Sequence, residues 1–357
     1  MIEVNRFSQL NRFLIGSASF GVVLLIIQHF AGFIVTIIVA VILAILFTPF
    51  LSWLQNKGLP KAGAFILTLI VVILIMVGLF LFLLLSLNRL NAAVPVYAAE
   101  LEDVKVQVQS LLASLGMDLS ESQSLTGLMG PNDLANFVKQ ILSTLVGVLS
   151  DGITILLMLA FLLIGASSFS TKANQLIEQG NPGLSRLYKF NKDIRHYLLI
   201  TNNVGLAAAA VNTIMLTLIG VDFALLWGVL SYLLSYIPYI GFLLALIPPA
   251  LLALLEFGWP TAVFIVIAYF VINFAIDDVI KPRLMGEGLD LAPVIVFVSV
   301  LFWGLILGPL GGLLAVPVTV GMKQLVLEPD PDNRWIAELI GGDEAENEGD
   351  GKTAANR

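Results

Sequence analysis

Four side chains that could bind an ion or carry a proton lie close together near the end of an apolar segment. Asn273, Asp277, Asp278 and Lys281 all occur in the stretch NFAIDDVIK. Charged side chains are costly at membrane depth, so those found there usually face a bundle interior or a water-filled cavity. Asp277 and Lys281 are also spaced to pair on a helix surface. The cluster is therefore predicted to line a solute or ion pathway or, alternatively, to form an ion pair at the membrane interface.

A second group of candidates lies in a hydrophobic segment that contains residues unsuited to a regular helix. The segment SYIPYIGFLLALIPP holds Pro238, Gly241 and Pro248 and no charged residue. Proline removes a backbone donor, and non-helical backbone at membrane depth survives only inside protein or beside an aqueous cavity. The break is therefore predicted to open toward a cavity. Gly241 would permit a close backbone approach, and Tyr236 and Tyr239 would offer hydroxyl groups to a solute or to neighbouring helices.

A related pattern recurs in the next long apolar block. The segment PLGGLLAVP holds Pro309, Gly312 and Pro317, so both segments read Pro-x-x-Gly, then Leu-Ala, then a further proline. The spacing to the last proline differs, which makes this a weak internal repeat. A single break of this kind is typical of a kinked packing helix. Two related breaks in the C-terminal third instead favour the binding region of a transporter.

Other polar residues inside apolar segments are weaker candidates. Asn212 is expected to form a hydrogen bond between helices, with contact to a transported solute as the alternative. Asp151 lies part-way along another apolar segment. Asp222 is expected to cap the helix that follows it.

The sequence lacks the residues that several kinds of catalytic or energy-coupling site require. It contains no cysteine and only two histidines, His29 and His196, too few for a thiolate or histidine-based metal site. A phosphate-binding Gly-x4-Gly-Lys-Ser/Thr loop and a His-Glu-x2-His motif are both absent from the sequence. These absences indicate a protein that is not an enzyme and uses no cofactor or metal. Any transport would be passive or coupled to an ion.

The composition predicts a protein whose main partner is the lipid bilayer. Hydrophobic residues make up 58% of the 357 and charged residues 12%, with a mean hydropathy of +0.96. A soluble domain carries about twice that charged fraction. The net charge of −7 comes from the end of the chain, where nine of the last thirty residues are acidic, and no basic surface for nucleic acid is indicated. The predicted fold class is all-α and polytopic, with helices in the C-terminal third that are broken or re-entrant.

Apolar runs long enough to span a bilayer divide the chain into regions. Residues 1–87 are predicted to hold three spans, near 13–29, 32–52 and 62–87, and 141–167 a fourth. Between them lies a polar, partly helical extramembrane region, 88–140. A basic segment, 168–196, precedes a C-terminal transport core, 197–326. The acidic tail, 327–357, is predicted to be mostly disordered, with one short helix in EPDPDNRWIAELIGG.

The distribution of lysine and arginine predicts the orientation. Basic residues precede the first span, join the second to the third, and fill 168–196, so these segments and the N-terminus are predicted to be cytoplasmic. If the block 223–256 crossed the membrane once, Lys281 and Arg283 would lie outside, against that trend. Re-entrance or deep breakage in this block is therefore the preferred prediction.

Three stretches together resemble the autoinducer-2 exporter family: IPYIGFLLALIPP, DDVIKPRLMGEGLDLAPVIVFVSVLFWGLILGPLGGLLAVPV and FTPFLSWLQNKGLPKAGA. The resemblance extends over about residues 10–326 and departs from the family pattern at Phe242, where proline is common. It implies a bacterial inner-membrane protein of about eight spans and a homo-oligomer, with a pentamer plausible. Members of the family are associated with efflux of a small quorum-sensing furanone, and some with sodium–proton antiport.

The predicted function is export of a small polar solute of the autoinducer-2 type without ATP. The first alternative is exchange of Na⁺ or Li⁺ for H⁺, for which Asp277, Asp278 and Asp151 supply carboxylates. The second alternative is a membrane protein that transports nothing and binds partners through its polar segments.

Overall fold

The computed structural model describes residues 9–114, 131–178, 182–285, 291–331 and 333–342. Every regular element in these ranges is a helix, which confirms the predicted all-α class. Five helices are long and apolar enough to cross a membrane by length and composition: Ala31–Asn56, Lys61–Tyr97, Pro182–Ile219, Trp259–Met285 and Pro309–Leu327. Shorter apolar helices lie between them. The chain is therefore a polytopic membrane protein, and the count of about eight spans stays a prediction.

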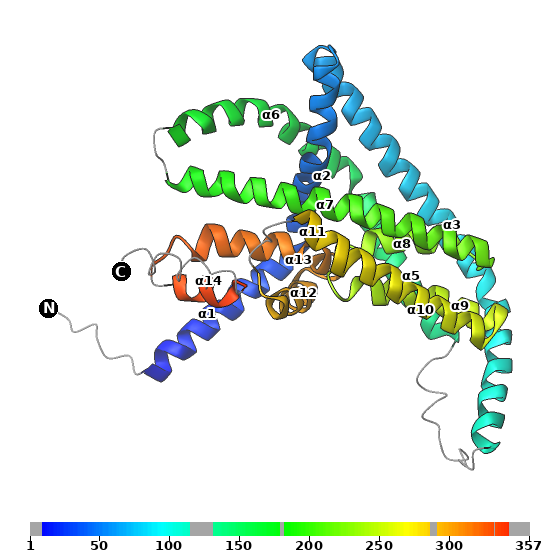
Figure 1. Cartoon of the computed structure of the whole chain (residues 1–357). Coiled ribbons are helices and arrows are strands. Elements are labelled where there is room, and N and C mark those ends of the chain that lie inside the picture. The colour runs from blue at the N-terminus through cyan, green and yellow to red at the C-terminus, as the bar shows by residue number, and fades with distance from the viewer. Residues whose placement is uncertain (1–8, 115–130, 179–181, 286–290, 332, 343–357) are drawn as a thin grey trace, which may run out of the picture.

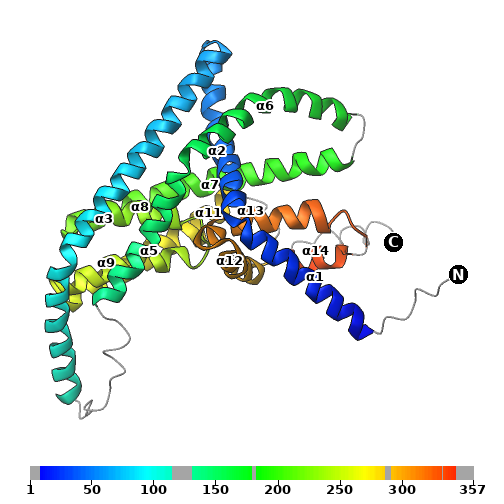
Figure 2. The same ribbon diagram turned by 180° about the vertical axis from the view of Figure 1, so that it is seen from behind.

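The N-terminal helices are α1 (Gln9–His29), α2 (Ala31–Asn56) and α3 (Lys61–Ser114). The first two join at Phe30, close to the division expected at Gln28 and His29. Helix α1 projects away from the other helices, and α2 and α3 form a tall hairpin (Figures 1 and 2). The third helix continues past residue 87, where the predicted span ends, into the region that was predicted to be partly helical, where apolar residues recur at helical spacing. It contains Pro95 without stopping.

The predicted fourth span is interrupted. Helix α5 (Pro131–Ser150) ends and α6 (Gly152–Glu178) begins on either side of Asp151, which is exposed in the turn between them. Helix α5 packs along α3, whereas α6 packs against α2. The expectation that Asp151 lies inside a single span is therefore wrong, because the chain changes direction at this residue.

The C-terminal half begins with the long helix α7 (Pro182–Ile219) and continues through short elements that pack against it and against one another. They are α8 (Ala224–Leu234), α9 (Gly241–Phe257), α10 (Trp259–Asn273), the π-helix η1 (Phe274–Ile280), α11 (Lys281–Met285), α12 (Pro293–Leu307), α13 (Pro309–Met322), the π-helix η2 (Lys323–Leu327) and α14 (Arg334–Ile340). Helix α14 confirms the short helix expected in the tail. The rest of the predicted disordered tail, from residue 343 on, lies outside the described residues.

Two helical hairpins in this half share the same turn. Gly258 joins α9 to α10 with φ 81° and ψ −176°, and Gly308 joins α12 to α13 with φ 76° and ψ −168°. Glycine adopts such positive φ values without the penalty that a side chain adds. A proline in the first turn of α10 and of α13 then starts each helix. The apolar block 291–326 is thus broken as predicted, at Gly308.

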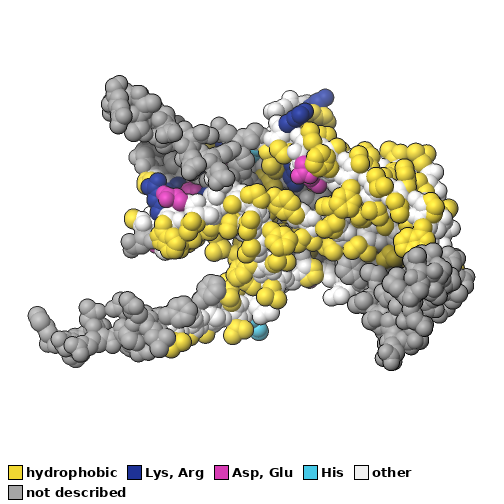
Figure 3. Space-filling view, turned by 60° about the horizontal axis from the view of Figure 1, so that its bottom comes forward, with side chains coloured by type: hydrophobic (Ala, Val, Ile, Leu, Met, Phe, Trp, Pro, Cys, Tyr) yellow, Lys and Arg dark blue, Asp and Glu magenta, His cyan; other side chains and the backbone are white. Residues whose placement is uncertain are grey.

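Much of the surface is hydrophobic. Ile153, Leu218 and Leu305 are each at least four-fifths exposed. On the face shown in Figure 3, hydrophobic side chains spread over most of the described surface, and charged side chains gather in a few places. The largest buried cluster centres on Trp227, Tyr269 and their neighbours in α8, α9, α10, α12 and α13. The core thus lies among the broken helices, and the outer faces suit lipid.

A polar contact joins the long helix α3 to the C-terminal half. The Tyr97 hydroxyl donates to Asp222 Oδ2 at 2.7 Å and lies 3.2 Å from Glu256 Oε1. Asp222 was expected to cap α8, but the N-cap residue is Phe223 and it makes no capping hydrogen bond with its side chain. The Asp222 carboxylate instead accepts from Tyr97, because α3 passes beside the turn between α7 and α8.

Tyr97→Phe is expected to lower the free energy of unfolding by about 1 kcal/mol, since two carboxylate groups lose a hydroxyl donor. Thermal melting in detergent measures this change. The matched control is Tyr188→Phe, at an exposed tyrosine on α7, which should melt like the wild type. Equal melting of the two variants would show that the Tyr97 contact adds nothing to stability.

Candidate functional site

The break between α8 and α9 borders a cavity of about 730 Å³. Five of the residues predicted from the sequence line it: Pro238, Tyr239, Asn273, Asp277 and Asp278. They come from the break, the end of α10 and the π-helix η1, which lie apart in the sequence. The remaining walls come from α7, α8, α9, α11, α12 and α13. We call this hollow the polar cavity.

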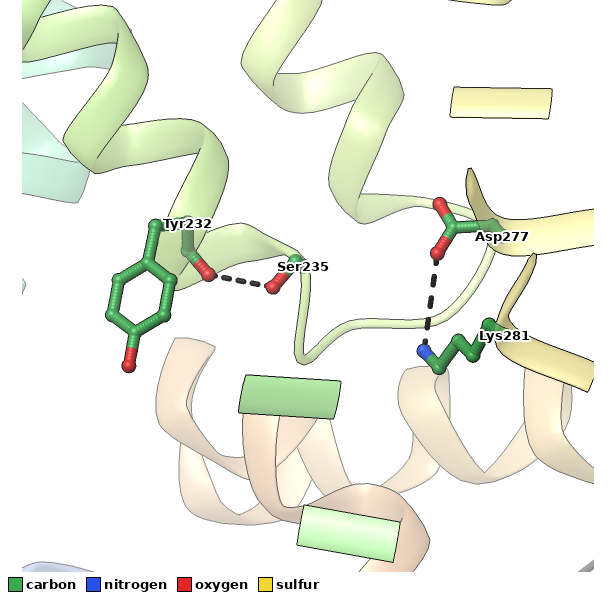
Figure 4. A network of polar contacts seen from close by, with 4 residues as sticks. All are labelled: Tyr232, Ser235, Asp277 and Lys281. Carbon is green, nitrogen blue, oxygen red and sulfur yellow. Dashed lines mark hydrogen bonds and ion pairs between the residues drawn. The ribbon is translucent and has the colours of Figure 1, made fainter. Parts of the chain in front are cut away.

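A π-helix presents the charged residues to the polar cavity. Its turn is wider than that of an α-helix, and π-helical turns occur frequently at functional sites. Asp277 lies within this element, and Lys281 follows it directly. The Lys281 ammonium is 3.9 Å from Asp277 Oδ1 (Figure 4). It also lies 5.9 Å from the centre of the Tyr197 ring. The predicted ion pair is present, and both of its members line the cavity.

The charges in this wall are unequally exposed. The Lys281 side chain is 13% exposed and that of Asp277 is 41% exposed. Asp278 also lines the cavity and is exposed. Lys281 is the one basic residue in the described lining, so the formal charges of Asp277, Asp278 and Lys281 sum to −1. A cation or a neutral hydroxylated solute suits this wall better than an anion.

Three residues of the lining carry hydroxyl groups whose oxygen atoms are buried. They are Tyr197 on α7, Ser231 on α8 and Tyr269 on α10. The Tyr269 hydroxyl interacts with that of Ser231, and the Tyr197 hydroxyl with that of Thr201. These hydroxyls therefore join helices behind the cavity wall. The sequence analysis missed all three residues. Each places a polar side-chain group inside an apolar helix, which is the signal that selected Asn212.

The break itself is a short non-helical segment from Ser235 to Ile240. Ser235 Oγ donates to the Tyr232 carbonyl at 2.7 Å (Figure 4). Tyr239 has φ 64°, an outlier for a bulky residue. A Cβ on Gly241 would collide with the backbone carbonyl oxygen of Leu234. The close approach expected at Gly241 is confirmed, and the unusual dihedral angle lies at Tyr239.

Tyr236 lies outside the cavity lining. Its hydroxyl donates to Asn202 Oδ1 at 3.2 Å, and the Tyr232 hydroxyl donates to the same oxygen at 2.6 Å. Asn202 belongs to α7, so these bonds join α8 and the break to α7. Of the two roles considered for the Tyr236 hydroxyl, the structure has the contact to a neighbouring helix.

Three more predicted residues do not reach the cavity. Pro248 and Pro317 are buried inside α9 and α13, and both helices continue through them. The expectation that these prolines interrupt the helices is therefore wrong, since local adjustments in a membrane helix can satisfy the backbone groups that proline frees. Asn212 is 1% exposed on α7, and neither of its amide atoms has a hydrogen-bond partner among the described residues. The expected bond between helices is not seen there.

Pro309 and Gly312 line a second hollow of about 300 Å³. In the sequence repeat, Gly312 is the position equivalent to Gly241. In the structure, Gly311 is the residue that shares the close backbone approach of Gly241. A Cβ on Gly311 would collide with the Trp303 carbonyl oxygen, whereas a Cβ on Gly312 would lie 3.7 Å from its nearest neighbour, Val300 Cγ1. The pattern thus located the second turn but selected the wrong glycine for the close approach.

Comparison with known proteins places this architecture among membrane transport proteins. A family model described as AI-2E family transporter matches residues 14–328. The AI-2 transport protein TqsA of Escherichia coli (strain K12) is 30% identical over 314 residues, which cover 88% of this chain and 91% of TqsA. The YhhT protein of the same strain is 28% identical over 324 residues, covering 91% of this chain and 92% of YhhT. The residues matched by the family model include the break, the π-helix η1 and the second hairpin.

Proposed function

Because the chain belongs to the AI-2E transporter family, we propose that it exports a small, uncharged, polar solute of the autoinducer-2 type through the polar cavity and without ATP. The observation that carries the proposal is the polar cavity itself, whose described lining combines Asp277, Asp278 and Lys281 with apolar side chains. A solute with hydroxyl and carbonyl groups can exchange hydrogen bonds with these three charged side chains. The cavity volume of about 730 Å³ is within the usual range of small-molecule sites.

The proposed setting is a bacterial inner membrane with the N-terminus in the cytoplasm. The basic segments that flank the first spans support this orientation. A homo-oligomer, with the pentamer suggested by the family resemblance, is part of the same proposal.

A second candidate function is exchange of Na⁺ or Li⁺ for H⁺. The observation that favours it is the pair of carboxylates, Asp277 and Asp278, in the wall of the polar cavity. A carboxylate binds either a proton or a monovalent cation, which is the chemistry that exchange requires. A third candidate, a membrane protein that binds partners and transports nothing, has no comparable feature in the cavity.

Flux measurements in proteoliposomes distinguish these functions. We expect vesicles loaded with autoinducer-2 to release it several-fold faster than protein-free vesicles, with no need for ATP. If the exchange function is correct, an imposed pH gradient will instead collapse when Na⁺ or Li⁺ is added, and Asp277→Asn or Asp278→Asn will abolish the collapse. If neither flux exceeds that of the protein-free control, both transport functions are contradicted and the partner-binding alternative is favoured.

A further inference from the structure

The break between α8 and α9 separates two hollows of opposite character. On one side is the polar cavity with its hydroxyl and charged groups. On the other is the smaller hollow of about 300 Å³, formed by α5, α8, the break, α9, α12 and α13. Thr144 is the one residue in its described lining with a polar side chain. We call this hollow the apolar pocket.

Ile237 is the one described residue that lines both hollows. It is 8% exposed and belongs to the central hydrophobic cluster. Its Cδ1 atom lies 3.8 Å from the position that a Cβ on Gly312 would occupy. The Ile237 side chain therefore forms part of the partition between the polar cavity and the apolar pocket, and Gly312 leaves open space beside it.

The backbone that carries Ile237 is strained and only partly hydrogen-bonded. Pro238 has no N–H group, and the following Tyr239 has φ 64°. Such a conformation costs on the order of 1–3 kcal/mol and is retained where surrounding structure enforces it, often at switch regions. The segment is held by the Ile237 N–H to the Leu234 carbonyl at 2.9 Å, by the Ile240 N–H to the Pro238 carbonyl at 2.7 Å and by the Gly241 N–H to the Ile237 carbonyl at 3.0 Å. The Tyr236 hydroxyl adds a bond to Asn202 Oδ1. A rearrangement would have to exchange these bonds, and it would release the strain at Tyr239.

We propose that Ile237 is a movable apolar gate of the transport pathway. In the position seen here, its side chain closes the polar cavity. When the break rearranges, the side chain enters the apolar pocket and opens the cavity wall to the solute. This inference rests on the proposed function, because it assumes that a polar solute crosses the polar cavity.

The chemistry of the two hollows supports a gate of this kind. An aliphatic side chain can enter the apolar pocket without losing hydrogen bonds, whereas a hydroxylated solute would lose them there. An aliphatic constriction also resists the passage of water and ions while it is closed.

Cysteine labelling tests the movement without any solute. The natural chain has no cysteine, so Ile237→Cys can be labelled alone by a membrane-impermeant methanethiosulfonate. The matched control is Ile276→Cys, which is 9% exposed and lines the polar cavity but not the apolar pocket. We expect labelling at position 237 to be at least tenfold faster than at position 276. Equal rates would show that Ile237 is a static residue of the cavity wall and overturn the gate.

A steric variant tests whether the apolar pocket receives the side chain. Gly312→Ala places a methyl group next to Ile237, at ordinary contact distance from Val300. It should melt like the wild type yet slow both autoinducer-2 flux and labelling of Ile237→Cys several-fold. The smaller side chain in Ile237→Ala/Gly312→Ala should restore flux. Unchanged flux in Gly312→Ala, or no recovery in the double variant, would contradict the proposal.

A lipid chain in the apolar pocket is the competing occupant. Gly304→Ala fills the same pocket at another point, 4.0 Å from the Gly312 nitrogen. If the variants act by displacing a lipid, both glycine variants should slow flux equally, and Ile237→Ala should rescue neither. That result would refute the gate. Since labelling needs no solute, fast labelling without flux would refute only the proposed function. Flux with slow labelling would refute only the gate.

Discussion

Gly241→Ala is expected to abolish transport and to lower the melting temperature, because the added methyl group collides with the Leu234 carbonyl oxygen. Overpacking of this kind costs about 1–3 kcal/mol, and here the neighbouring atom is backbone, which cannot rotate away. The break would have to shift, and with it Pro238 and Tyr239 in the cavity wall. Thermal melting and flux per folded molecule, measured on the same purified protein, separate the two effects.

Two further glycine variants serve as comparisons. Gly311→Ala should be as damaging to stability as Gly241→Ala, because its methyl group would collide with the Trp303 carbonyl oxygen. Gly78→Ala should match the wild type in both measurements, since nothing lies within 4 Å of its Cβ position on α3. If Gly241→Ala melts and transports like Gly78→Ala, the close approach at the break has no role in the protein.

Lys281→Met is expected to reduce flux at least tenfold, which corresponds to about 1.4 kcal/mol in the barrier. It removes the one cation of the cavity lining and leaves Asp277 and Asp278 without it. Asp277→Asn should reduce flux by a similar factor, because it leaves Lys281 unpaired in a largely buried position. Autoinducer-2 flux from proteoliposomes, with a melting curve for each variant, measures both effects.

The double variant separates a structural ion pair from a functional one. Asp277→Asn/Lys281→Met removes both charges, so the protein should regain stability, because no buried charge is left unpaired. If flux recovers too, the pair only supports the fold and the site assignment fails. The matched control is the exposed pair of Arg334 and Glu338, 3.3 Å apart with the same spacing. Arg334→Met should change stability by less than about 0.5 kcal/mol and leave flux unchanged.

Local chemistry made several features predictable. The high apolar content indicated a polytopic membrane protein because too few polar residues remain to cover a soluble surface. Pro238 and Pro309 marked the breaks because proline and glycine act on the backbone within one helical turn. Asp277 and Lys281 were predictable as a pair from their spacing alone.

Other features depended on packing between distant segments. Tyr197, Ser231 and Tyr269 come from three helices, and nothing in the sequence around each one indicates that all three residues line one cavity. The prolines at 248 and 317 look like Pro238 in sequence, yet their helices continue because the surrounding structure accommodates them. Ile237 is one of many apolar residues, and only the arrangement of two hollows distinguishes it.

The sequence alone therefore determined the membrane class, the all-helical fold and two of the breaks, near Pro238 and Pro309. The tertiary structure decided which residues share the cavity, which glycine needs the close approach and where the third and fourth predicted spans end. The physical reason lies in the solvent. A helix in lipid can be apolar on every face, so hydrophobic periodicity does not show which face packs inward. Proline, glycine and charge act locally and can be read from the chain, whereas the convergence of side chains is set by helix packing.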